Sequence, residues 1–416
     1  MEKKPFVAAI LAVGSELLTP FRTDTNSLYL TEQLNSLGID VKLKMVVGDE
    51  LERIVECVRV ATQSADLIIA TGGLGPTEDD LTREAFAAVL GRKLIRSEEL
   101  LQGLRARFAR YGFRMTPNNE RQADVIEGAE ILPNARGSAP GQFIEDGNTV
   151  MVLLPGPPGE MMTMFEREAL PRLRQRYRGF FMARRQLRVG GLTESAMDNM
   201  IAPIYRAYSN PTTTVLSSLT GLEVHLTATG STMEEAQSLI NELSAKLEEK
   251  LGANVVSTDG ASLEQVIKQL CVARGYTVAL AESCTGGLIA KRLTDVPGSS
   301  AYFIGGVVAY ANQVKVEWLD VPATLIETHG AVSAQVAEAM AQGVQHKMGA
   351  TIGLAVTGIA GPEGGTAEKP VGLVYIGLAL KDRVEHKELR IPGDRERVRE
   401  LTTTFALDWL RRTLIG

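Results

Sequence analysis

Residues 281–287 read Ala-Glu-Ser-Cys-Thr-Gly-Gly, so a hydroxyl (Ser283) and a thiol (Cys284) stand side by side before two glycines. The apolar run at 276–280 predicts a buried strand before them, and the apolar spacing at 288–293 predicts a helix after them. Glycines allow a tight turn there, and the first amides of such a helix can hold an anion or an oxyanion. The stretch therefore predicts either nucleophilic catalysis at a strand-to-helix turn or, more simply, a helix cap with a cysteine in the core.

A base for this nucleophile must come from elsewhere in the chain. Lys315 lies just beyond another predicted strand, 303–310, and a partly buried lysine loses proton affinity and can act as a neutral base. Serine–lysine pairs are an alternative to serine–histidine pairs. Three other interpretations stay open: His329 as the base, Cys284 as the nucleophile because a helix N-terminus lowers a thiol pKa, and Lys315 as an ordinary solvated residue.

A second stretch with chemical potential lies in the first half of the chain. After an apolar run at 66–70, residues 71–80 read Thr-Gly-Gly-Leu-Gly-Pro-Thr-Glu-Asp-Asp. Its three glycines would let main-chain amides approach phosphate oxygens, and Asp79 and Asp80 are oxygen donors suited to a hard divalent cation. Turns at 23–27 and 154–161 are candidates for the same pocket, although each could also be ordinary turn structure.

Composition limits the class of protein. At 416 residues the chain is long enough for two or three domains. Its net charge of -6 argues against nucleic-acid binding as the main role, and three scattered cysteines suggest neither a disulfide framework nor a zinc site. Residues 1–5 lead into a strand-like run and not a signal-peptide core, and no apolar stretch reaches the roughly 18–20 residues of a membrane helix. We expect a cytoplasmic protein.

The elements that must position these residues alternate along the chain. Strand-like runs at 6–13, 41–47, 66–70 and 149–153 and helical patterns at 26–37 and 51–61 predict βαβ units in the first half. The alternation resumes after residue 262, with helical patterns at 263–273 and 336–346, strands at 276–280, 303–310 and 352–356, an antiparallel pair at 371–380 and 384–391, and a final helix after Asp394. In such sheets ligands bind beyond the carboxyl ends of the strands, where both stretches lie.

The segment between the two halves has a different texture. Seven arginines make it basic at its start: Arg172, Arg174, Arg176, Arg178, Arg184, Arg185 and Arg188. This run could bind nucleic acid, but solvated linker charge or pairing with acidic neighbours explains it more simply. An alternating strand at 222–228, which carries His225, and a helix at 234–251 predict a small α+β module that acts as a spacer or dimerisation unit.

The motifs resemble those of the CinA family (competence/damage-inducible protein A). In the first half the resemblance is carried by residues 14–18, 24–27, 72–82 and 155–161, and this part is similar to molybdopterin-binding MogA/MoaB proteins. In those relatives Thr stands where this chain has Leu74, and Asp80 falls on their functional aspartate. The resemblance implies a nucleotide-like ligand at Asp24, Asn26, Gly72, Gly73, Gly75, Asp79 and Asp80. It also implies cleavage of the ADP-ribose pyrophosphate with a divalent metal (Mg or Co, tentatively at Asp79 and Asp80) and K⁺.

The second half resembles the CinA C-terminal domain, which also occurs alone as a nicotinamide mononucleotide (NMN) deamidase. Its motifs lie at 281–287, 297–300, 310–315, 329–333, 357–362, 369–372 and 393–395. The resemblance implies Ser283 as nucleophile, Lys315 as its base and Tyr310 as an aid to proton transfer. It implies substrate contacts at Thr357 and Arg395, with an oxyanion held by amides of Thr285, Gly286 and Gly287. No cofactor is expected for this reaction.

The resemblance also predicts the architecture: two three-layer α/β/α domains, at 1–171 and 258–416, joined by a KH-like module at 172–257. The expected partners are the small nucleotides NMN and ADP-ribose and a second copy in a homodimer, with no membrane or nucleic acid. Two other functions stay open. One is a non-enzymatic nucleotide-binding protein associated with competence or DNA damage, and the other is a first domain that handles a pterin.

Overall fold

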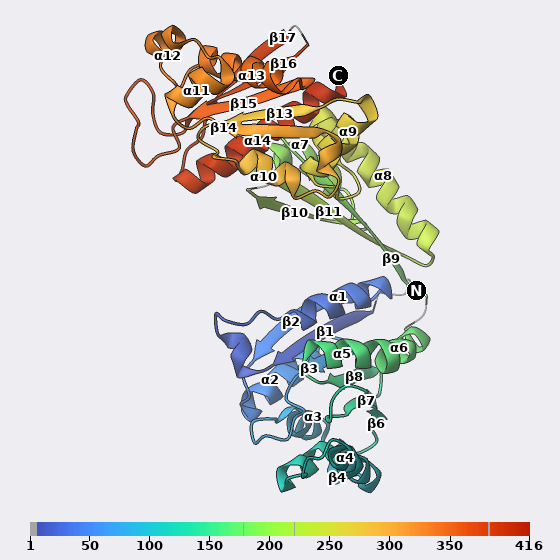
Figure 1. Cartoon of the computed structure of the whole chain (residues 1–416). Helices are drawn as coiled ribbons and strands as arrows, with labels where there is room; N and C mark the ends of the chain where they lie inside the picture. Colours follow the sequence, from blue (N-terminus) through green and yellow to red (C-terminus); the bar gives the residue numbers. More distant parts are fainter. Residues whose placement is uncertain (1–5, 178, 220, 382) are drawn as a thin grey trace. The chain divides into compact units, whose positions relative to one another are not determined.

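The computed structural model describes residues 6–177, 179–219, 221–381 and 383–416, so Met1–Pro5 and Arg178, considered above, lie outside it. The described chain forms two compact units, residues 1–183 with 228–238 and residues 184–227 with 239–416 (Figure 1). Both mix helices and sheets, which confirms the predicted α/β class. No helix within the described residues is both long and apolar enough to cross a bilayer.

The first unit is built on a six-stranded sheet in the order β2-β1-β3-β8-β7-β6. Its strands are β1 (Val7–Val13), β2 (Asp40–Val47), β3 (Leu67–Thr71), β6 (Glu130–Leu132), β7 (Gly141–Asp146) and β8 (Thr149–Leu154). The first four strands in this order run parallel, as predicted, whereas β7 and β6 are antiparallel additions. A separate pair is formed by β4 (Leu94–Arg96) and β5 (Asp124–Ile126).

Helices cover both faces of this sheet. Alternate residues of the parallel strands enter two cores because successive side chains of a strand point to opposite faces. One core includes residues of α1, α5 and α6, and the other includes residues of α2 and α3. The helices are α1 (Asn26–Ser36), α2 (Leu51–Thr62), α3 (Thr82–Leu90), α4 (Glu98–Arg110), α5 (Pro158–Met164) and α6 (Leu170–Arg176), with short turns η1 (Ser15–Leu18), η2 (Pro117–Ala123) and η3 (Phe165–Ala169).

The second unit contains the C-terminal sheet and most of a second sheet. A four-stranded sheet, in the order β10-β11-β9-β12, corresponds to the α+β module. Its elements are β9 (Phe181–Val189), α7 (Glu194–Tyr205), β10 (Thr212–Ser218), β11 (Gly221–Gly230), α8 (Met233–Leu251), η4 (Gly252–Asn254) and β12 (Val255–Ser257). Several arginines of the basic run pair with acids, namely Arg172 with Glu130 and Glu168, Arg176 with Glu145, and Arg188 with Glu223.

The C-terminal sheet has the order β14-β13-β15-β16-β17. Its strands are β13 (Val278–Glu282), β14 (Phe303–Val308), β15 (Ile352–Gly358), β16 (Leu373–Leu380) and β17 (Arg383–Arg390). The first three are parallel, and β16 and β17 form the predicted antiparallel pair. Because β13 has β14 on one side and β15 on the other, the chain changes direction across the sheet at β13, which is where α/β proteins bind ligands.

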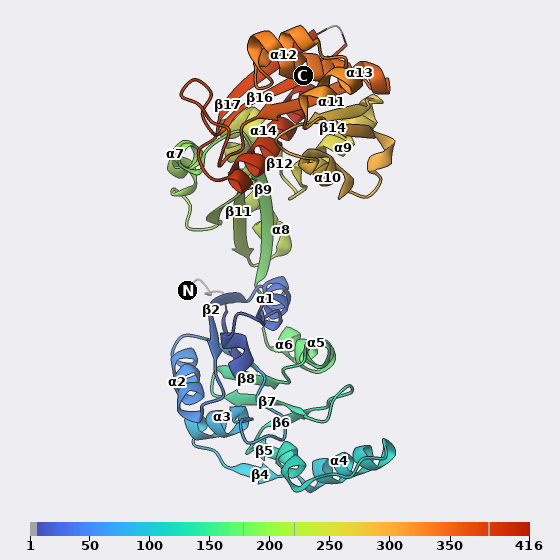
Figure 2. The same ribbon diagram turned by 60° about the vertical axis from the view of Figure 1, so that its left-hand side comes forward.

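Two layers of helices enclose this sheet, as both views show (Figures 1 and 2). One core contains residues of α9, α10 and α14, and the other contains residues of α11, α12 and α13. The helices are α9 (Leu263–Arg274), α10 (Leu288–Thr294), η5 (Ser299–Ala301), α11 (Asn312–Leu319), α12 (Ala323–His329), α13 (Ala334–Met348) and α14 (Arg395–Ile415).

Helix α14 also joins the C-terminal sheet to the α+β module. Arg411 is fully buried, pairs with Asp408, and donates to the carbonyls of Ala253 (2.7 Å) and Val255 (3.1 Å). A buried guanidinium needs several acceptors, and here three are supplied at once. These contacts explain why the module and the C-terminal sheet form one compact unit.

Candidate active site

The turn that carries Ser283 follows β13, and the amine that reaches it comes from α11. The Nζ of Lys315 lies 3.4 Å from the Oγ of Ser283, and it donates to the carbonyls of Ala309 (2.8 Å) and Tyr310 (3.1 Å). β13 and β14 run parallel, so the segments after them meet at one edge of the sheet. The structure therefore brings together the serine and the lysine that the sequence singled out.

The environment of Lys315 favours a neutral amine. Its side chain is only 1% exposed, and burial lowers its pKa below the ordinary value of 10.5. A neutral amine has two N–H groups and one lone pair. In the structure Nζ donates to the Ser283 Oγ as well as to the two carbonyls; in the neutral form the carbonyls can keep the two N–H groups, and the lone pair then faces the Ser283 hydroxyl. This is the arrangement that a general base needs.

Cys284, the rival nucleophile, is buried in the core beneath the turn. Burial raises the pKa of its thiol to about 12, so the thiol stays protonated at neutral pH. The lowering of the pKa that a helix N-terminus could provide does not prevail here, because desolvation is the largest effect. Cys284 is therefore disfavoured as the nucleophile and instead packs in the hydrophobic core.

The N-terminus of α10 is occupied by a side chain that the sequence interpretation overlooked. Glu282 is 2% exposed, and its carboxylate accepts from the amides of Gly287 (3.0 Å), Ile289 (3.1 Å) and Ala290 (2.8 Å). The amide of Gly286 donates to the carbonyl of Ser283 (3.1 Å). The expectation that the amides of Gly286 and Gly287 hold an oxyanion is therefore corrected, since both already have acceptors within the protein.

Three further predicted residues surround the turn. Thr357, at the end of β15, is 1% exposed and donates from Oγ1 to the carbonyl of Ala331 (2.7 Å). Arg395 begins α14 and donates to the Tyr310 hydroxyl (3.0 Å) and to the carbonyl of Gly361 (3.0 Å). Tyr310 is 59% exposed, so the hydrogen-bonded pair of Tyr310 and Arg395 is open to solvent.

His329, the rival base, lies exposed at the C-terminal end of α12. The main-chain carbonyl of His329 accepts a hydrogen bond from the Nζ of Lys369 (2.6 Å). No contact between its ring and Ser283 is found in the part of the chain that the structure describes. The position beside the serine is taken by Lys315.

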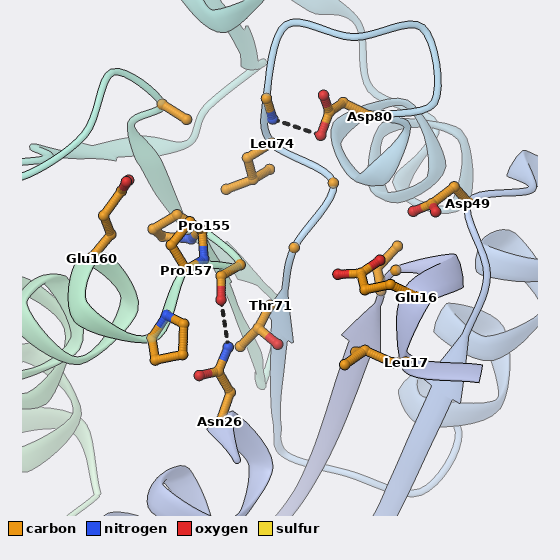
Figure 3. Close-up of a pocket in the computed structure, with 18 of the residues that line it drawn as sticks. Glu16, Leu17, Asn26, Asp49, Thr71, Leu74, Asp80, Pro155, Pro157 and Glu160 are labelled. Atoms are coloured by element: carbon orange, nitrogen blue, oxygen red, sulfur yellow. Dashed lines mark hydrogen bonds between the residues drawn. The ribbon is translucent and has the colours of Figure 1, made fainter. Parts of the chain in front are cut away.

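The first unit has a pocket of about 690 Å³ at the carboxyl ends of its parallel strands (Figure 3). The three motif loops predicted to share a pocket do so. They are linked directly, because Asn26 donates to the carbonyl of Gly156 (2.8 Å) and the Gly72 amide donates to that of Leu154 (3.0 Å). A Cβ on Gly72, whose φ is +95°, would lie 2.1 Å from the Val13 carbonyl oxygen, so only glycine fits there.

The pocket is lined by more acids than the sequence interpretation named. Glu16, Asp49 and Glu160 line it beside Asp24, Asp79 and Asp80, and Arg22 is the one basic side chain among the described lining residues. Glu16 and Asp49 lie together on one wall of the pocket (Figure 3). A signal for these acids was present, because Asp49 follows the end of β2 by two residues and Glu16 and Glu160 lie within the motifs at 14–18 and 155–161.

The two aspartates of the glycine-rich loop have different roles in the structure. Asp80 accepts from the amides of Gly75 (2.8 Å) and Thr77 (2.8 Å) and from the Thr77 hydroxyl, so it shapes the loop. Asp79 is exposed, and a hydrogen bond from Thr77 lowers its pKa. Within the described residues no group of three or more His, Cys, Asp or Glu side chains is arranged to hold a metal. Asp79 fits a cation that a ligand's phosphate helps to hold, as Mg²⁺ often is.

Three family models match successive parts of the chain. They are described as a probable molybdopterin binding domain (residues 9–175), a damage-inducible protein CinA KH domain (184–257) and a CinA C-terminal domain (260–414). Among solved structures, the competence/damage inducible protein CihA from Agrobacterium tumefaciens is 42% identical, with 37% of this chain and 96% of that chain covered and a TM-score of 0.36.

Curated relatives match the whole length. A CinA-like protein of Koribacter versatilis is 50% identical over 413 residues, which cover 98% of this chain and 100% of that protein. A CinA-like protein of Dictyoglomus thermophilum is 45% identical over 407 residues, with 98% and 99% covered. A putative competence-damage inducible protein of Alkaliphilus oremlandii is 41% identical over 409 residues, again with 98% and 99% covered. The chain therefore belongs to the CinA family, with a MogA/MoaB-like first domain, a KH-like module and a CinA C-terminal domain.

Proposed function

We propose that the C-terminal domain is a nicotinamide-nucleotide amidase that hydrolyses NMN to nicotinate mononucleotide and ammonia, in pyridine nucleotide recycling. The observation that carries this proposal is the desolvated amine of Lys315, 3.4 Å from the Ser283 hydroxyl at the end of a parallel strand. A carboxamide is a poor electrophile, and the cationic pyridinium of NMN makes its carbonyl carbon more reactive. The site therefore combines an activated alcohol with a substrate class that it can attack.

The reaction proceeds in two halves. Ser283 Oγ attacks the carboxamide carbon while Lys315 takes the hydroxyl proton, and the proton then leaves with ammonia from the tetrahedral intermediate. Water then attacks the acyl carbon; its proton passes to the Lys315 amine and from there to the leaving Ser283 Oγ, which regenerates both residues. Because Gly286 and Gly287 have oxygen acceptors of their own, we assign the oxyanion to the amide of Thr285, whose present acceptor is the Cys284 sulfur, a weak one. Arg395, with a planar fork of donors, is suited to the phosphate of NMN.

The test is ammonia release from NMN by the full-length protein and by Ser283→Ala. We expect the variant to lose turnover by about 10³-fold or more, because no other group at the turn can form the acyl-enzyme. Ser300→Ala, an exposed serine outside the site, is the matched control and should retain wild-type turnover. Equal turnover by wild type and Ser283→Ala would refute the proposal.

For the first unit we propose a metal-dependent ADP-ribose pyrophosphatase. The supporting observation is the 690 Å³ pocket, large enough for a nucleotide, where Gly72, Gly73 and Gly75 form a loop beside Asp79. A pocket with six carboxylates and one arginine repels a pyrophosphate unless cations accompany it. When bound, a divalent ion would neutralise the phosphate oxygens, with Asp79 and, if its loop rearranges, Asp80 as the ligands.

The corresponding experiment offers ADP-ribose with Mg²⁺, Co²⁺ or a chelator, with and without K⁺, and measures AMP and ribose 5-phosphate. Turnover with metal but not with chelator would support the proposal, whereas tight molybdopterin binding without hydrolysis would favour a pterin-handling domain. Salt-sensitive DNA binding without turnover by either half would instead favour the non-enzymatic role. We also propose a homodimer, to be checked by the solution mass.

A further inference from the structure

We propose that Arg399 is a positioning residue for the amidase: it holds the main chain of the turn that carries Ser283 in the geometry needed for attack. This assignment rests on the amidase function proposed above. It adds a residue that belongs to none of the motifs considered in the sequence. Arg399 acts through the carbonyl of Thr285 and not through the substrate.

The contact is made from the second turn of α14. The guanidinium of Arg399 donates to the carbonyl of Thr285 through both Nη2 (2.9 Å) and Nε (3.3 Å). Thr285 stands two residues after the nucleophile, and its side chain is fully buried. Hydrogen bonds from an ionised donor are stronger than neutral ones, so this carbonyl is firmly oriented.

Within the turn, the Gly286 amide donates to the Ser283 carbonyl (3.1 Å), and the Thr285 carbonyl accepts a long hydrogen bond from the Leu288 amide (3.4 Å). Gly286 (φ +62°) and Gly287 (φ +92°) are both in the left-handed region, and two successive glycines leave the backbone many alternative conformations. The hydroxyl of Thr285 is buried without a hydrogen-bond partner within the described residues, so this side chain does not fix the turn either. Besides these main-chain bonds, two side chains hold the turn: Glu282 through the Gly287 amide, and Arg399 through the Thr285 carbonyl.

The neighbouring arginines of α14 have other surroundings. Arg395, one helical turn earlier, contacts Tyr310 and Gly361. Arg397 lines a different hollow of the second unit, together with Leu401 and Phe405. Arg397 therefore has the same charge on the same helix but, among the described residues, no hydrogen bond to the Ser283 turn, which makes Arg397→Ala the matched control.

The experiment compares the steady-state kinetics of full-length wild type, Arg399→Ala, Arg399→Lys and Arg397→Ala with NMN. We expect Arg399→Ala to lower kcat by roughly 10- to 100-fold, because a displacement of about 1 Å costs on that order, with KM changed less than about threefold. Arg399→Lys keeps one charged donor and should fall in between, and added guanidinium ion should partly restore Arg399→Ala. Arg397→Ala should behave like wild type.

Two results would overturn the assignment. A rise in KM at unchanged kcat would show that Arg399 binds the substrate phosphate, and unchanged kinetics would show that the turn holds itself. If Arg399→Ala folds poorly, by its melting temperature, the kinetics of Arg399→Lys decide. If the wild type releases no ammonia, the proposed function fails. The assignment is then judged by whether a fluorophosphonate labels Ser283 more slowly in Arg399→Lys than in wild type, and equal labelling would refute it.

Discussion

The Nζ of Lys315 and the Oγ of Ser283 lie 3.4 Å apart, and the amine is held there by the carbonyls of Ala309 and Tyr310. The lysine is thus fixed by the main chain that leads from β14 into α11. The partner on the serine side is fixed as well, because the Ser283 amide donates to the carbonyl of Val356 in β15 (3.0 Å). The lysine is therefore held by the segment after β14, and the main chain of the serine is held by β15; β14 and β15 are the two neighbours of β13 in one sheet.

Replacing Lys315 by Met should abolish ammonia release from NMN. The Met side chain has nearly the same volume but no basic group to take the Ser283 proton, so kcat should fall by about 10²- to 10⁴-fold, the usual contribution of a general base. Lys291→Met is the control, because that lysine is exposed and pairs with Asp295, the residue just after its own helix. Wild-type turnover by Lys315→Met would remove the lysine from the mechanism.

The pH dependence of kcat/KM and that of the free energy of unfolding should both reflect the titration of the Lys315 amine. Burial lowers the pKa of Lys315 below 10.5, and the neutral form is the base, so kcat/KM should rise with pH through that lowered pKa. Between the lowered pKa and 10.5 the unfolded chain binds more protons than the folded one, so the free energy of unfolding should increase with pH in this window. Lys315→Met should lack this contribution, which chemical denaturation at a series of pH values would measure.

Cys284→Ala should leave the amidase largely intact. The thiol is buried and protonated, so its removal should change kcat by less than about threefold and lower the free energy of unfolding by about 1 kcal/mol, as is typical of a small core truncation. Iodoacetamide should likewise fail to inactivate the native protein. Rapid inactivation, or a loss of turnover as large as that of Ser283→Ala, would restore the cysteine as nucleophile.

Much of the fold follows from local patterns in the sequence. The alternation of apolar strands and amphipathic helices predicted the parallel strands of both sheets, and the antiparallel pair β16–β17 was predicted from its position and length. The short strands β6 and β7 were missed, because strands of three and six residues show little hydrophobic periodicity in the sequence. The predicted strand at 276–280 ends two residues before the observed strand β13 (Val278–Glu282). The prediction stopped there because Glu282 is acidic, whereas in the structure Glu282 is buried and its carboxylate accepts from three amides at the start of α10.

The candidate sites were predictable only in part. Ser283, Lys315 and the glycine-rich loop stand at strand ends, so their type and position pointed to chemistry. Glu282 and Arg399 form hydrogen bonds with main-chain groups, which every residue has, so these contacts produce no recognisable motif in the sequence. The family resemblance supplied the roles of Tyr310, Thr357 and Arg395, which remain predictions.

Arg395→Ala should weaken the binding of NMN more than the chemistry. If its guanidinium faces the phosphate, KM for NMN should rise by about tenfold or more, whereas nicotinamide riboside, which has no phosphate, should be turned over equally by variant and wild type. Tyr310→Phe removes the hydroxyl that Arg395 contacts and tests whether that contact matters for the same parameter. An equal rise in KM for both substrates would assign Arg395 to the wall of the site and not to the phosphate.

In the first unit, Asp79→Asn and Asp80→Asn should have different consequences. Asp80 accepts from Gly75 and from Thr77, so its replacement should lower the free energy of unfolding of this unit by about 1–3 kcal/mol. Asp79 is exposed, so Asp79→Asn should leave the melting temperature unchanged but remove most of the metal-stimulated ADP-ribose hydrolysis. Glu78→Gln, the exposed acid next to it, is the control. Metal-stimulated hydrolysis that survives in Asp79→Asn would move the cation to the wall formed by Glu16 and Asp49.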